Sequence, residues 1–235
     1  MSQLLVCCTS VEELLDEFGM TFQVVLIGAD GVVLGSDRLF AERGLRGALG
    51  IGKNFSKKIY ISDDKSVVCA FAGGPNSEVI ARRITTECKP SGLSDMQWRN
   101  RIEEAAAPIT EYEEHIVDEV IVIRADNNSV LKVIRQRNET PNFSPVSQFI
   151  CSGVGADAPL IPKLLWRPDL SVNQLKNLAL VAVEYAHKEF PNLVGGGANL
   201  IALKSNGEMS EVSYSDTQVT KICAEFIQKF YRSLK

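Results

Sequence analysis

The sequence lacks the features that mark membrane and nucleic-acid-binding proteins. No apolar run approaches the roughly 18 residues that a membrane-spanning helix needs. Lysine and arginine do not cluster with aromatic residues, and the net charge is -4, so neither a membrane nor nucleic acid is an expected partner. Only two histidines are present, His115 and His187, and neither has a second ligand at metal spacing. We therefore expect no metal and no other cofactor.

Six cysteines are scattered along the chain, and none forms a C-x-x-C pair. A chain of 235 residues is large enough to fold without disulfide bonds. They are expected to be reduced thiols. Residues 1–19 begin with apolar residues, but they have no basic start and become acidic, which excludes a secretory signal. These observations predict a cytoplasmic protein.

What the sequence does contain is a regular alternation of β-hairpins and helices. Apolar and β-branched runs around Asp, Asn or Gly turns predict hairpins at 21–37, 57–72, 119–136 and 198–213, with a short strand at 148–152. Capping residues and helical spacing predict helices at 11–18, from Asn76 or Ser77 onward, and at 94–116, 159–166, 172–190 and 216–233. Residues 45–52 and 137–147 are expected to be loops. Two sheets packed face to face, with helices outside, would bury such blocks.

Several short blocks along the chain resemble the β-type subunits of proteasomes and of the bacterial two-ring proteasome-like peptidase. The blocks are T-F-Q-V-V-L-I-G-A-D-G-V-V-L-G-S-D-R at 21–38, K-K-I at 57–59, A-F-A-G-G at 70–74, C-S-G-V-G-A-D-A at 151–158 and G-G-A-N-L at 196–200. The resemblance implies an α+β fold, the four-layer α-β-β-α sandwich of two antiparallel sheets found in N-terminal-nucleophile hydrolases. Residues 21–235 would form this domain. Residues 1–20 would be an N-terminal extension or propeptide, or the product of a mis-assigned start.

The resemblance also implies a catalytic set. Thr21 falls at the position of the N-terminal threonine, because its spacing to Asp37 matches the spacing in the family. Lys58 falls at the lysine beside the nucleophile. Gly73 falls at the glycine whose backbone N–H serves the oxyanion.

Three further positions follow from the same comparison. Ser152 aligns with the serine of the family's G-S-G turn, and Val154 is the alternative if the register slips. Ala41 and Phe71 fall at positions that shape the substrate pocket in the family, although a plain loop residue and a plain core residue would explain them equally well.

The chemistry expected of this set centres on Thr21. A threonine hydroxyl needs a base, and the α-amino group of an N-terminal threonine, with a pKa of roughly 7.7 to 8.0, can supply it. The Lys58 ammonium would lower the pKa of that amine, and Asp37 would hold Lys58 charged and oriented. The resemblance thus implies a threonine peptidase in stacked rings of its own copies, acting on peptide or unfolded-protein substrates, with a regulatory ATPase as a further candidate partner.

Two departures from the family pattern keep other readings open. Met20 stands between Gly19 and Thr21, although family members usually cleave after a glycine; if Met20 is the true initiator, methionine removal would expose Thr21. The family's supporting aspartate and serine fall here on Phe190 or Pro191 and on Val194. A catalytically silent ring subunit and a small-amide hydrolase of the same superfamily are the alternatives.

Overall fold

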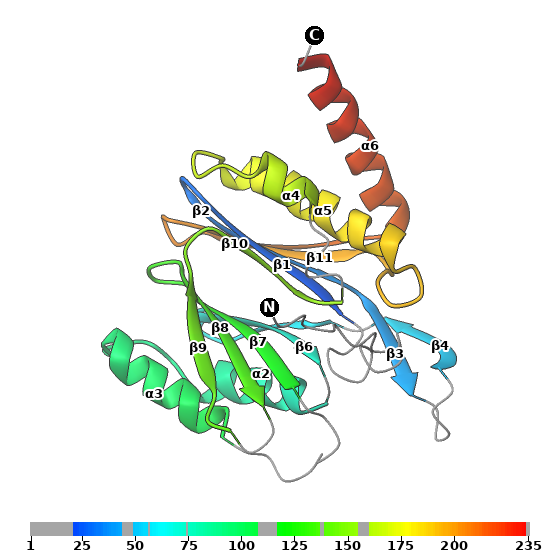
Figure 1. Cartoon of the computed structure of the whole chain (residues 1–235). Helices are drawn as coiled ribbons and strands as arrows, with labels where there is room; N and C mark the ends of the chain where they lie inside the picture. Colours follow the sequence, from blue (N-terminus) through cyan, green and yellow to red (C-terminus); the bar gives the residue numbers. More distant parts are fainter. Residues whose placement is uncertain are drawn as a thin grey trace, which may run out of the picture.

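A computed structural model describes residues 21–43, 49–55, 57–73, 75–107, 117–136, 139–154 and 160–233. Within these ranges, two five-stranded antiparallel sheets lie face to face, and helices cover the outer face of each (Figure 1). This arrangement confirms the expected four-layer α-β-β-α sandwich.

The first sheet contains the start of the described chain. Its strand order is β10-β1-β2-β11-β12. The strands are β1 (Phe22–Gly28), β2 (Gly31–Asp37), β10 (Phe149–Gly153), β11 (Ala198–Lys204) and β12 (Met209–Tyr214). The predicted hairpins at 21–37 and 198–213 are confirmed, and β11 pairs with β2, so Asp37 lies opposite Ala198.

The second sheet has the order β5-β6-β7-β8-β9. Its strands are β5 (Ile59–Ile61), β6 (Val67–Gly73), β7 (Val117–Arg124), β8 (Ser129–Gln136) and β9 (Asn142–Val146). The hairpins expected at 57–72 and 119–136 are confirmed. The expected loop at 137–147 is wrong for β9, because an edge strand tolerates Pro145: its missing N–H has no ladder to complete on the outer side.

A separate two-stranded sheet pairs β3 (Leu39–Arg43) with β4 (Leu49–Phe55). The loop expected at 45–52 is therefore wrong from residue 49 onward, and residues 45–48 lie outside the described residues. The glycines of this segment lower its strand propensity, but main-chain pairing with β3 does not depend on side chains.

The helices α2 (Pro75–Glu87) and α3 (Asp95–Ala105) cover the second sheet, while α4 (Leu160–Leu165), α5 (Val172–Glu189) and α6 (Asp216–Ser233) lie on the side of the first (Figure 1). The expected cap at Asn76 or Ser77 is wrong, because α2 begins with Pro75, whose fixed φ suits a first helical position. The helix expected at 94–116 ends at Ala105, and its residues 108–116, like the helix expected at 11–18, lie outside the described residues.

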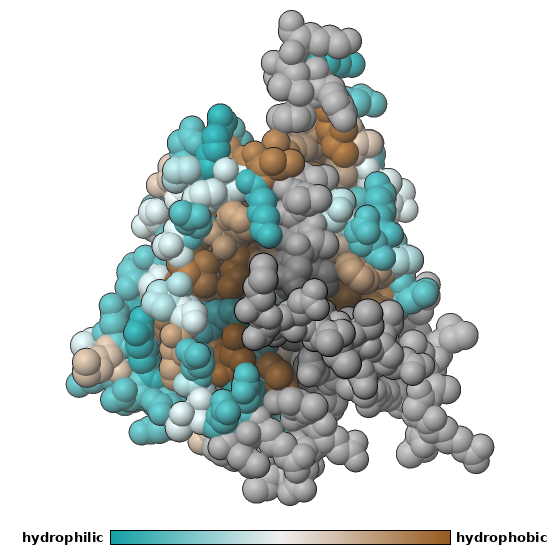
Figure 2. All heavy atoms as spheres, viewed as in Figure 1, coloured by the Kyte–Doolittle hydropathy of each residue, from teal (hydrophilic) through white to brown (hydrophobic). Residues whose placement is uncertain are grey.

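The core lies in three layers of apolar side chains. One cluster fills the space between the sheets, where Val25, Leu34, Ile59 and Ile121 meet. The two others lie between each sheet and its helices. On the face shown in Figure 2, apolar residues gather between the two halves of the molecule, and hydrophilic residues cover the flank.

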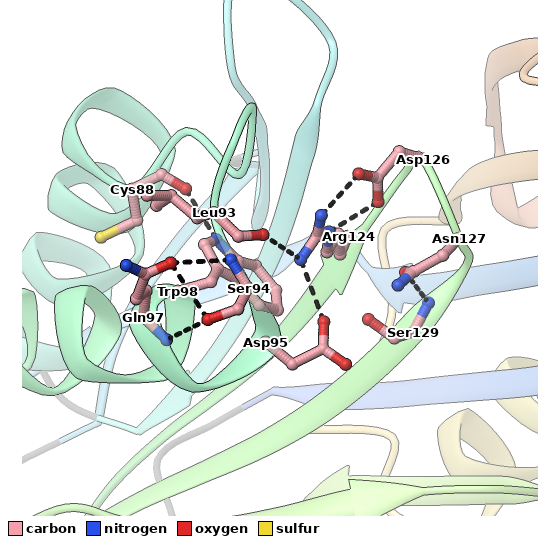
Figure 3. A network of polar contacts seen from close by, with 10 residues as sticks. All are labelled: Cys88, Leu93, Ser94, Asp95, Gln97, Trp98, Arg124, Asp126, Asn127 and Ser129. Carbon is pink, nitrogen blue, oxygen red and sulfur yellow. Dashed lines mark hydrogen bonds and ion pairs between the residues drawn. The ribbon is translucent and has the colours of Figure 1, made fainter.

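A polar network fixes α3 to the turn between β7 and β8 (Figure 3). The Arg124 guanidinium pairs with Asp126 at 2.6 Å and with Asp95 at 3.0 Å, and it lies over the Trp98 ring. The Trp98 indole N–H donates to the carbonyl of Cys88 at 2.8 Å. The second sheet is thereby held to α3 at the end of β7 as well as through the apolar core.

Candidate functional site

Asp37, at the end of β2, is the centre of a buried polar site. One carboxylate oxygen, Oδ1, accepts from Lys58 Nζ at 2.8 Å and from the Phe22 N–H at 2.9 Å. The other, Oδ2, accepts from the N–H groups of Leu39 and Gly195, each at 3.2 Å. Four donors around one carboxylate favour its charged form.

Lys58 precedes β5 and reaches Asp37 from the second sheet. Its side chain is fully buried, as is that of Asp37. Burial lowers the pKa of Lys58, and the Asp37 carboxylate opposes that shift. Burial likewise raises the pKa of Asp37, against the effects of Lys58 and of the Phe22 and Gly195 amides. The pair can stay ionised because each group supplies the countercharge that the other has lost with its water.

Thr21 lies directly before β1 and is 4% exposed. Its backbone carbonyl accepts from the Val154 N–H at 2.8 Å, and the amide of the next residue, Phe22, binds Asp37. The main chain on the C-terminal side of Thr21 is therefore fixed by β10 and by the carboxylate at the end of β2.

Gly153 shows how closely three strands approach at Thr21. A Cβ added to Gly153 would lie 1.9 Å from the Thr21 carbonyl oxygen and 3.3 Å from Ala72 Cβ, and its φ of +81° is also unfavourable for other residues. Only glycine lets β10 pass between Thr21 and the end of β6. The geometry thus brings Thr21, Asp37 and Lys58 into one site, with Gly73 next along β6 from Ala72.

Gly73 ends β6 with a φ of +114°. A side chain here would meet Ser77 Oγ at 2.7 Å and the Val117 carbonyl at 3.1 Å. The strand, glycine turn and helix order expected around Gly73 is present, since α2 begins at Pro75. Its service to an oxyanion stays a prediction.

Ser152 lies near the end of β10, one residue before Gly153. In the register of the first sheet it faces Gln23, while Val154 supplies the N–H that binds the Thr21 carbonyl. The Ser152 hydroxyl and both polar atoms of the Gln23 carboxamide are buried without a hydrogen-bond partner among the described residues. Which of Ser152 and Val154 corresponds to the family's serine stays a prediction.

The two expected pocket residues are placed differently. Phe71 is 4% exposed, stacks on the Tyr60 ring with centroids 5.8 Å apart, and packs in the cluster beneath α2 and α3. Ala41 lies in β3, where its backbone pairs with Lys53. The structure gives Phe71 a core role, and a pocket role for either residue stays a prediction.

The glycine run before β11 contributes to the site in a way that the sequence did not reveal. Gly195 donates its N–H to Asp37, and its carbonyl accepts from the N–H groups of Arg38 and Leu39 at 2.9 and 2.8 Å. By themselves, three consecutive glycines at 195–197 indicate only a tight turn. The position of that turn opposite the end of β2 depends on strand pairing, which no local pattern reveals.

The described residues show no group of three or more His, Cys, Asp or Glu side chains arranged to hold a metal ion. In the same part of the chain, no helix combines the length and apolar character that crossing a membrane requires.

The two face-to-face antiparallel sheets, with helices on each outer face, give the chain an α-β-β-α sandwich of the N-terminal-nucleophile hydrolase type. Comparison with protein-family models and with curated proteins gave no match. Solved structures do match, and three of them are Anbu proteins, which are proteasome-like.

Three of these structures align over nearly the whole chain. An Anbu (Gly-1) mutant from Hyphomicrobium sp. strain MC1 is 14% identical, with 91% of this chain and 97% of that chain covered and a TM-score of 0.67. Anbu from the same strain is 13% identical, with 91% and 96% covered and a TM-score of 0.65. Anbu (ancestral beta-subunit) from Yersinia bercovieri is 10% identical, with 91% and 96% covered and a TM-score of 0.64.

These neighbours correct the expected family. Assignment to the β-type subunits of proteasomes, as a bacterial proteasome-like homologue, is wrong, since these three structures belong to the distinct Anbu group. At identities of 10 to 14% the likeness shows the fold.

Proposed function

We propose that this chain is a threonine-type peptidase of a self-compartmentalising, proteasome-like ring, with Thr21 as the nucleophile once the residues before it are removed. The observation that carries the proposal is the fully buried Lys58–Asp37 ion pair, whose carboxylate also binds the amide directly after Thr21. Burying two charges is costly, so a pair placed behind a strand that directly follows Thr21 favours a functional role.

In the proposed reaction, Thr21 Oγ attacks the carbonyl carbon of a peptide bond, and the hydroxyl proton passes to the Thr21 α-amino group. That proton then moves to the leaving nitrogen as the C–N bond breaks, which leaves an ester on Thr21. Water adds to the ester while the same amine accepts its proton, and collapse of this adduct restores the hydroxyl and releases the acid. The Gly73 amide would stabilise the oxyanion in both steps.

The role proposed for Lys58 is electrostatic. Its ammonium, held by Asp37, would disfavour a second positive charge on the Thr21 amine and so keep more of that amine neutral near pH 7. The main-chain bonds from Phe22 to Asp37 and from Val154 to Thr21 would fix the nucleophile during both steps. The free, buried cysteines of the described chain agree with action in a reducing cytoplasm.

A catalytically silent ring subunit is the second candidate. It is favoured by Val194, which stands buried where the resemblance expects a supporting serine, and by Met20 in place of a cleavable glycine. In that case the Lys58–Asp37 pair would serve only to join the two sheets.

A labelling experiment separates the two candidates. The chain is produced with Thr21 as its first residue and treated with a threonine-directed electrophile, and the modified residue is identified by mass spectrometry. The enzyme predicts an adduct at Thr21 that Thr21→Ala abolishes and Thr86→Ala, on the outer surface of α2, leaves intact. Absence of any adduct on a folded chain with a free Thr21 would favour the silent subunit. Turnover of peptides against small amides then defines the substrate class.

A further inference from the structure

A single peptide group connects α5 to the candidate site. The Gly195 N–H donates to Asp37 Oδ2 at 3.2 Å, and on the other side of the same peptide bond the Val194 carbonyl lies 2.5 Å from His187 Nδ1. Because a carbonyl can only accept, His187 must carry its proton on Nδ1. The Val194–Gly195 peptide therefore links His187 directly to Asp37.

The orientation of this peptide is set by further contacts. The Gly195 carbonyl binds the amides of Arg38 and Leu39, and the Val194 side chain is fully buried. A Cβ on Gly195 would lie 3.0 Å from His187 Nδ1, so the imidazole packs against the glycine. His187 thus both binds and covers the peptide that holds Asp37.

We propose that His187 is a positioning residue of the candidate site. By donating to the Val194 carbonyl, it orients the peptide and polarises it, which strengthens the hydrogen bond from the Gly195 N–H to Asp37. Asp37 in turn holds Lys58. His187 would then replace support that side chains at 190, 191 and 194 cannot give here, because Phe190, Pro191 and Val194 have no side-chain hydrogen-bonding groups.

The catalytic part of this inference rests on the proposed function, but its structural part does not. A residue that only packs at the end of α5 would affect stability. The chemical shift of the Gly195 amide proton would then not depend on where the side chain at 187 carries its hydrogen-bond donor. The test must therefore vary the position of the donor on the side chain at 187 while keeping that side chain polar.

Two conservative variants of the full chain do this. In His187→Asn the amide nitrogen takes the place of Nδ1, whereas in His187→Gln it takes the place of Nε2 and is one bond too far along. With glycine labelled by ¹⁵N, we expect the Gly195 amide proton to keep its shift in His187→Asn and to move upfield in His187→Gln, as its hydrogen bond to Asp37 weakens. Equal shifts in both variants, or none in either, would overturn the proposal.

Two further measurements complete the test. With Thr21 as the first residue, the rate of labelling by a threonine-directed electrophile should fall about 10- to 100-fold in His187→Gln and stay near that of the unaltered chain in His187→Asn. If the unaltered chain is not labelled, the proposed function fails while the Gly195 comparison still decides the role of His187. If the variants do not fold, ¹⁵N imidazole shifts of the unaltered chain decide: a proton on Nε2 alone contradicts the proposal.

Discussion

Lys58 Nζ lies 2.8 Å from Asp37 Oδ1, and neither side chain is exposed to solvent. The contact joins the two sheets at the point where β1 begins. Because a buried charge without a countercharge costs several kcal/mol, each residue makes the other tolerable. The pair is therefore a structural element of the sandwich whether or not Thr21 reacts.

Removing one member of the pair is expected to destabilise the protein strongly. Lys58→Met leaves a buried carboxylate without its cation and should lower the free energy of unfolding by about 3 to 5 kcal/mol, measured by urea denaturation. The matched control is Lys57→Met, because Lys57 pairs with Glu211 at 2.7 Å on the surface and is half exposed. Its effect should be much smaller, since exposed ion pairs contribute little. Equal losses in the two variants would contradict the role assigned to burial.

Alanine variants of two glycines with similar φ angles distinguish the effect of backbone strain from that of a steric clash at the site. Gly153 and Gly207 have φ values of +81° and +85°, but a Cβ on Gly153 would meet the Thr21 carbonyl while one on Gly207 would meet nothing within 4 Å. Both alanine variants should lose roughly 1 to 2 kcal/mol from backbone strain. Only Gly153→Ala should also displace Thr21, which would be seen as a further loss of stability and of electrophile labelling. Similar behaviour of the two would show that β10 does not fix Thr21.

The Gln23 carboxamide, which has no hydrogen-bond partner in the described part of the chain, is expected to be a net cost to stability. Replacing it by leucine, a side chain of similar size, should raise the free energy of unfolding by about 1 to 3 kcal/mol in urea denaturation. Asn199→Leu is the control in the same row of the sheet, because Asn199 is also buried but accepts from Ser213 Oγ at 2.7 Å. That variant should be destabilised. A loss in Gln23→Leu would mean that the carboxamide has a partner in solution.

Tyr60 gives a prediction for alkaline pH. Burial, with a hydrogen bond to Glu78, raises the pKa of Tyr60 to about 12. An unfolded chain releases this proton near its ordinary pKa of about 10, so the stabilising contribution is complete below that pH and is lost as pH rises toward about 12. Tyrosinate absorbance should show one group titrating late, and Tyr60→Phe should remove it. A Tyr60→Phe chain with the same late titration would contradict the assignment.

The sequence was most informative where local patterns specify structure. The Asp-Gly turn at 30–31 and the Asn-Gly turn at 206–207 correctly predicted two hairpins, and the helical spacing of apolar residues correctly predicted α5. Such features depend on residues a few positions apart. The sandwich itself followed from their order together with the family resemblance.

Other features depend on long-range contacts and could not be predicted. β4 contains glycines that read as a loop, yet its backbone pairs with β3. The register of β10 decides that Val154, and not Ser152, binds the Thr21 carbonyl. The link from His187 to Asp37 runs through Gly195, and Gly195 and Asp37 are 158 positions apart in the sequence. No local spacing reveals such contacts.

The most direct test of the central claim is the N-terminal sequence and intact mass of the mature protein, purified from the cells that naturally produce it. An N-terminal threonine nucleophile requires a free α-amino group on Thr21, so the account predicts a chain that begins at Thr21, with residues 1–20 absent. A mature chain that retains Met1 or Met20 would contradict it, because Thr21 would then have no amine to act as its base.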